Sequence, residues 1–156
     1  MEEIAARAGV GVGTVYRRFA SKDALMDELL RMAMEQLSTA AEQALARTDG
    51  HGLEDLLLAF GREFAEHARY ADLLLAREPD AVAIRRIQDA AAELTARAVA
   101  AGTVGAGVTT SDFMALVSAL RGLVQTSGEV TPEAWHRFLD IHLAGLRATS
   151  ASGGRA

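Results

Sequence analysis

Apolar residues recur three or four positions apart along most of the 156-residue chain. This spacing places them on one face of an α-helix, so the pattern predicts an all-α fold. The predicted helices cover residues 22–47, 52–68, 70–78, 79–101 and 110–126, with a last helix that starts at residues 131–133. We expect Pro79 to occupy the first turn of its helix, and residues 48–50 and 102–107 to be breaks. In the first long helix the predicted apolar stripe includes Leu25, Leu29, Met32 and Leu37.

Residues 4–25 show a more specific pattern, in which two short apolar runs flank a glycine turn. The apolar positions are Ile4, Ala5 and Ala8 before the turn, and Val12, Val15 and Phe19 after it. Gly9 and Gly11 let the chain turn sharply, as a helix-turn-helix requires. Ser21 is predicted to cap the N-terminus of the next helix. Two short helices joined in this way usually present the second helix to a groove.

Polar residues on the second short helix fit contact with DNA. Gly13 and Thr14 lie at its start, where a small side chain and a hydroxyl suit contact with base edges. The donors that suit phosphate groups are Tyr16, Arg17, Arg18 and Lys22. A solvated basic helix tip is the alternative, since short charge clusters are common. The turn, the cap and the donors together favour DNA binding.

With these residues the chain resembles the TetR (tetracycline-repressor-like) family of bacterial transcription regulators. The matching positions are Ile4-Ala5, Ala8-Gly9-Val10, Val12 to Tyr16, Phe19, Ser21-Lys22 and Leu25. The resemblance implies that Val12, Gly13 and Thr14 face bases. It also implies that Tyr16, Arg17 and Lys22 hold phosphates, and that Val15 and Phe19 are core residues. Arg18 stands where the family usually has His or Tyr, and Gly11 replaces the usual Ser or Thr at the helix N-cap.

The same resemblance implies a further helix before the residue that matches Glu2. That helix would cover Ile4, Val15 and Phe19, and an upstream start codon or a genuinely short form would both account for its absence here. We expect residues 1–24 to form a partial helix-turn-helix domain, whose last helix continues to about residue 47. Residues 25–149 are expected to form a helical domain for effector binding and dimerisation, and residues 150–156 a disordered tail.

The last two helices are apolar over much of their circumference, which suggests a subunit partner. An interior position within one chain would explain the same pattern, and periodicity does not separate the two. In the TetR family this pair builds a four-helix dimer interface, so the resemblance favours a homodimer. The predicted interface residues are Phe113, Val117, Leu120, Val124, Trp135, Phe138, Leu139, His142 and Leu146.

The resemblance further implies a cavity for a small-molecule effector among the helices between residues 52 and 126. Four polar residues on largely apolar helices are candidates for orienting such a ligand: Arg62, His67, Arg121 and Gln125. They would equally fit surface positions with their apolar stems packed against the protein.

Composition and charge narrow the function class. The net charge is −5, but residues 1–22 carry +2 and the remainder −7, which puts the attraction for DNA at the N-terminus. The chain has no cysteine, which excludes disulfides and thiolate metal sites, and no apolar run of the ~18 residues that a membrane span needs. We expect a cytoplasmic protein that does not bind membranes.

Catalytic and cofactor motifs are weak. The glycine-rich segment 102–107 lacks the lysine of a phosphate-binding loop, and Glu133 with His136 makes only half of a bundle metal site. The sequence therefore predicts no enzyme activity, no metal and no cofactor. It predicts a dimeric TetR-type regulator, usually a repressor, released from operator DNA by a small molecule. The alternative is a truncated helical sensing and dimerisation protein without competent DNA binding.

Overall fold

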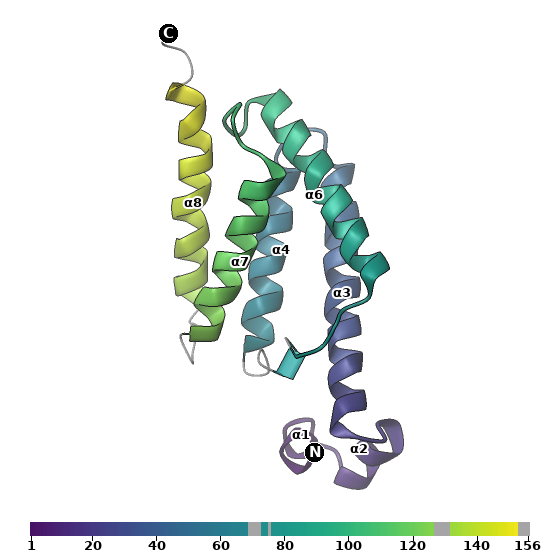
Figure 1. The fold of residues 1–156 in the computed structure, drawn as a ribbon. Helices are drawn as coiled ribbons and strands as arrows, with labels where there is room; N and C mark the ends of the chain where they lie inside the picture. The colour runs from purple at the N-terminus through teal and green to yellow at the C-terminus, as the bar shows by residue number, and fades with distance from the viewer. Residues whose placement is uncertain (69–72, 75, 127–131, 153–156) are drawn as a thin grey trace.

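The computed structural model describes residues 1–68, 73–74, 76–126 and 132–152, and within this part the fold is all-α, as predicted (Figure 1). The helices are α1 (Glu2–Arg7), α2 (Val12–Arg18), α3 (Lys22–Ala46), α4 (Gly52–Glu66), α6 (Ala81–Ala101), α7 (Thr110–Thr126) and α8 (Pro132–Ser152). Of the predicted helix at 70–78, residues 70–72 and 75 lie outside the described residues; among the others, Leu73 and Leu74 are helical and residues 76–78 are not.

Helices α1 and α2 form a small head at the foot of α3, away from the other helices (Figure 1). Gly9 adopts φ 65°, a left-handed conformation that favours glycine, and this produces the turn between α1 and α2. The Ser21 hydroxyl accepts a hydrogen bond of 3.0 Å from the Ala24 N–H, so Ser21 caps α3 as predicted. Val15 is buried in the head, whereas Phe19 is only half-buried.

The remaining helices form the body, in which α4 contacts α3, α6, α7 and α8. The core is aliphatic and aromatic because the apolar stripes of all five helices meet around α4. Its most deeply buried large side chains include Leu56 and Leu57 of α4, Leu94 of α6 and Phe113 of α7. The body therefore has its own core, and α3 alone continues from it into the head.

Three details differ from the pattern-based expectations. Pro79 precedes α6, whose N-cap is Asp80, because the Asp80 carboxylate accepts hydrogen bonds from Val82 and Ala83 N–H at 3.2 Å each. Met32 is 44% exposed, since it lies off the face of α3 that packs on α4 and α6. Helix α8 continues through residues 150–152, where a tail was expected, and residues 153–156 lie outside the described part.

The last two helices pack largely within their own chain. Gly61 of α4 lets α8 come so close that a methyl group at this position would lie 2.5 Å from Trp135 ring carbons. As a result, six of the nine predicted interface residues are buried in a single subunit, namely Phe113, Val117, Leu120, Val124, Trp135 and Leu139. These six are core residues and are not available to a second chain. Phe138, His142 and Leu146 are half-buried.

Candidate functional site

The side chains predicted to contact DNA are all exposed, on α2 and at the start of α3. Val12, Gly13, Thr14, Tyr16, Arg17 and Arg18 are exposed on α2, and exposed Lys22 begins α3 beside it. The Arg17 guanidinium donates a hydrogen bond of 3.1 Å to the Thr14 hydroxyl. Arg17 and Thr14 are thus positioned together, with the hydroxyl held beside a cation.

Arg18 has a different environment from the other basic residues of the head. Its guanidinium lies 5.4 Å from the centre of the Phe19 ring, within the range of a cation–π interaction. It also helps, after Arg31, to lower the pKa of the Glu28 carboxyl on α3. Arg18 therefore interacts with the foot of α3, which distinguishes it from Arg17.

The segment before α6 is joined to the foot of α3 by an arginine. Arg77 donates to Asp27 Oδ1 at 2.7 Å and to Asp23, and a third bond of 2.7 Å runs to the Leu73 carbonyl. The bonds to Asp27 and Asp23 raise the pKa of Arg77. This ion-pair cluster connects the segment before α6 to the first turns of α3, beside Lys22. The same segment borders the cavity between α3, α4 and α7.

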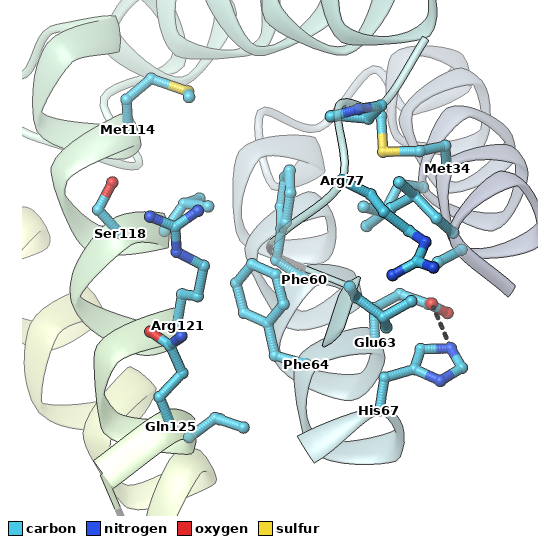
Figure 2. Close-up of a pocket in the computed structure, with 17 residues that line it drawn as sticks. Met34, Phe60, Glu63, Phe64, His67, Arg77, Met114, Ser118, Arg121 and Gln125 are labelled. Atoms are coloured by element: carbon cyan, nitrogen blue, oxygen red, sulfur yellow. Dashed lines mark ion pairs between the residues drawn. The ribbon is translucent and has the colours of Figure 1, made fainter. Parts of the chain in front are cut away.

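A cavity of about 340 Å³ lies between α3, α4 and α7 and is bordered by Leu74, Arg77 and Pro79 (Figure 2). Its walls are mostly apolar, with Leu30, Ala33, Met34 and Leu37 from α3, Phe60 and Phe64 from α4, and Met114, Val117 and Val124 from α7. This size and lining suit a small organic ligand. Two of its walls, α4 and α7, belong to the predicted region between residues 52 and 126, but the third wall is α3, which the prediction did not include.

Three of the four predicted ligand residues line this cavity. His67 lies on one wall, and Arg121 and Gln125 lie on the opposite wall (Figure 2). Arg62 is exposed and is not in the lining, because its position on α4 is turned away from the face that carries Phe60 and Glu63.

Sequence reasoning missed three polar lining residues: Glu63, Arg77 and Ser118. The position of Glu63 could have been predicted, since it follows Leu56 and Phe60 at helical spacing on the buried stripe of α4. The position of Arg77 could not, because nothing in the pattern of the helix predicted over residues 70–78 indicates that this segment borders the cavity.

Glu63 is buried at 8% exposure, and its Oε2 has no hydrogen-bond partner within the described part of the chain. The nearest cationic group recorded for this oxygen is His67 Nε2 at 3.5 Å (Figure 2). The polar interaction with Glu63 raises the pKa of His67, and partial burial opposes this shift without cancelling it. A buried carboxylate with an oxygen that lacks a hydrogen bond is energetically costly and calls for an explanation.

Replacing Glu63 with glutamine should lower the pKa of His67. The neutral amide keeps the shape of the side chain but no longer stabilises the imidazolium, so the titration should move down towards the value of about 6.5 of an unperturbed histidine. NMR titration of the His67 ring in wild type and E63Q measures this shift. An unchanged His67 midpoint would show that Glu63 does not set its charge.

A helix-turn-helix head on a helical body defines the class of helix-turn-helix transcription regulators. Residues 1–29 match the bacterial regulatory proteins of the tetR family, and residues 54–148 match the C-terminal domain of SbtR-like transcriptional regulators. The chain belongs to the TetR family of transcription regulators.

A solved structure supports this assignment. The chain is similar to a TetR transcriptional regulator from Streptomyces coelicolor, with 29% sequence identity and a TM-score of 0.64. The match covers 94% of this chain and 86% of the other. No curated protein sequence matches significantly.

Among the described residues, no helix has the length and apolarity to cross a membrane. The same residues contain no group of three or more His, Cys, Asp or Glu side chains arranged to hold a metal ion.

Proposed function

We propose that this regulator binds operator DNA through α2 and is released, as a repressor, when a small molecule fills the cavity between α3, α4 and α7. It would act on DNA in the bacterial cytoplasm. The main support is that one continuous helix, α3, serves both regions. Its first residue is Lys22, beside the DNA-facing side chains, and its middle part lines the cavity with Leu30, Met34 and Leu37.

The division of roles on the head follows from chemistry and exposure. Phosphate oxygens would accept hydrogen bonds from Tyr16, Arg17 and Lys22, and Tyr16 is 54% exposed. Such phosphate contacts fix the position of the protein on DNA without reading the base sequence. Thr14 and its neighbours Val12 and Gly13 would lie against base edges. The Arg17–Thr14 hydrogen bond orients Thr14 before DNA arrives, so less ordering is left to occur on binding.

Release would depend on movement of α3 relative to α4 and α7. A ligand between these helices contacts α3 at Leu30 and Met34, two to three turns from Lys22. The Arg77 ion pairs with Asp23 and Asp27 tie the segment before α6 to the same part of α3. Movement of that segment would therefore reach the foot of α3 directly.

We further propose a homodimer through the outer surface of α7 and α8. The outer surface comprises Ala115 and Ala119 of α7 and Phe138, Ile141 and Gly145 of α8; all are exposed except half-buried Phe138. Ile141 is 57% exposed, which is unusual for an isoleucine in a helix that also packs on a core. Small residues beside large apolar ones permit close helix packing, and a symmetric dimer would present two heads to two half-sites.

Lys22 and Thr14 should affect DNA binding in different ways. Replacing Lys22 with alanine removes a phosphate contact, so affinity should fall for all sequences alike and the salt dependence of log K should flatten by about 0.9. Replacing Thr14 with valine should alter which sequences are preferred while leaving the salt slope unchanged. The measurement is fluorescence anisotropy against salt, with DNA enriched from a random library by the wild-type protein.

Arg31→Ala is the matched control for Lys22→Ala, since Arg31 is an exposed cation on the same helix that is paired with Glu28 and Glu35. It should leave both affinity and slope unchanged. A Lys22→Ala protein with altered preference and an unchanged slope would contradict the assigned roles. Failure of the folded wild-type chain to enrich any DNA would instead support a sensing dimer without DNA binding.

A further inference from the structure

The cavity differs chemically between its buried part and its rim. Glu63 presents an acidic group in the buried part, with its carboxylate directed towards His67 (Figure 2). The Phe60 and Phe64 rings, whose centres are 5.8 Å apart, line the same cavity. Arg121 and Gln125 are exposed on α7 across the cavity. A cavity that combines a buried acid with aromatic rings is a recognisable environment for a positively charged nitrogen.

Among the described residues, no cationic side chain forms a hydrogen bond with Glu63 Oε2, although His67 lies within ion-pair distance of it. Arg77 directs its guanidinium bonds to Asp23, Asp27 and the Leu73 carbonyl. His67 Nε2 is 3.5 Å from Oε2, which is long for a hydrogen bond between these groups. Arg121 is exposed, so water already solvates its charge.

We propose that the cavity binds an organic cation. This ligand has an apolar body and a protonated amine, and the amine donates a hydrogen bond to Glu63 Oε2. This inference rests on the proposed function, because it names the chemical class of ligand for the same cavity. The apolar body of the ligand lies against Met34, Phe64 and Met114, and the ammonium group supplies the missing hydrogen bond. A volume of about 340 Å³ accommodates such a molecule.

This arrangement should bind an anionic ligand less tightly than a cationic one. A carboxylate placed in the buried part would face Glu63, and two like charges at close range repel. At the rim it would meet Arg121, where solvent weakens the attraction. Selectivity for a cation over a neutral molecule of the same shape therefore depends on Glu63.

Three probes with the same tail test this proposal: 4-phenylbutylamine, 4-phenylbutanol and 4-phenylbutyrate. Calorimetric titration of the full chain without DNA at pH 7.5 should give tightest binding for the amine, which is protonated at this pH. In the E63Q variant the affinity for the amine should fall about 10- to 100-fold, as expected for loss of a hydrogen bond to a charged group. Affinity for the alcohol should change less than about threefold.

Glu66→Gln is the matched control, because Glu66 is an exposed carboxylate on the same helix and does not line the cavity. It should leave amine binding unchanged, and thermal melting checks that both variants fold. The proposal is overturned if wild type does not bind the amine, or if it binds the amine and the alcohol equally. Tighter binding of 4-phenylbutyrate, lost in Arg121→Ala, would identify an anion site instead. Because DNA is absent, these outcomes are separate from success or failure of operator binding.

Discussion

Leu139→Asp should unfold the chain, whereas Ile141→Asp should leave it folded and separate the subunits. The two positions are two residues apart on α8, but Leu139 is 0% exposed and Ile141 is 57% exposed. Loss of a buried leucine costs about 2–5 kcal/mol, and a buried charge without a partner costs several more. Together these approach the whole stability of a typical domain, about 5–15 kcal/mol.

Circular dichroism and sedimentation velocity at low micromolar concentration distinguish the two effects. Leu139→Asp should lose the cooperative thermal transition, while Ile141→Asp should keep its helical content and sediment as a monomer. Arg137→Asp, an exposed change on the same helix, controls for added negative charge outside the proposed apolar interface. If Ile141→Asp remains a dimer, the outer surface of α7 and α8 is not the interface. A stable, folded Leu139→Asp protein would contradict the packing of α8 on α4.

Gly61→Val should destabilise the body by about 3 kcal/mol or more. Glycine inside a helix costs up to about 1 kcal/mol relative to alanine, so its presence in α4 needs a packing reason. That reason is the Trp135 ring, 2.5 Å from where a Cβ would lie, with Leu139 Cδ1 at 3.3 Å. Trp135 is a large, buried ring, so the added side chain forces α8 away from α4.

For a chain of this size, 3 kcal/mol corresponds to a melting temperature lower by about 6–12 °C. Differential scanning calorimetry measures the change, and the fluorescence of Trp135, the one tryptophan in the sequence, reports whether its environment opens. Gly107→Val, in the exposed loop before α7, has nothing within 4 Å of an added Cβ and should change the melting temperature far less. Equal melting of Gly61→Val and wild type would show that α4 and α8 are not in close contact.

Local patterns in the sequence predicted most of the fold. The 3.6-residue period located every long helix within a few residues, and the Ser21 cap and Gly9 turn followed from side-chain chemistry. The prediction that Pro79 lies in the first turn of its helix was wrong, because the Asp80 side chain caps α6 and the helix begins after it. A cap depends on a particular hydrogen bond, which residue type alone does not establish.

The interface residues show a limit of pattern reading. Leu120 and Leu139 are apolar residues of the kind found at both cores and interfaces, and the partner that covers them is α4 of the same chain. Gly61 is the residue that allows this contact, but a lone helical glycine gives no indication of the element it faces. The cavity residues show the same limit. His67 was predicted as a polar residue on a largely apolar helix, whereas Arg77 reaches the cavity only through tertiary folding.

The unbroken length of α3 determines how a small change in the body appears at the DNA. Its 25 residues span about 37 Å, and Lys22 lies about 22 Å along the axis from Leu37 in the cavity wall. A rigid tilt of about 5° around Leu37 would move the head by about 2 Å. In a two-fold dimer the two displacements add to about 4 Å, against a half-site repeat of about 34 Å. The helix would act as a lever, so a ligand that shifts it by a fraction of an ångström beside the cavity could put the two recognition helices out of register with successive major grooves.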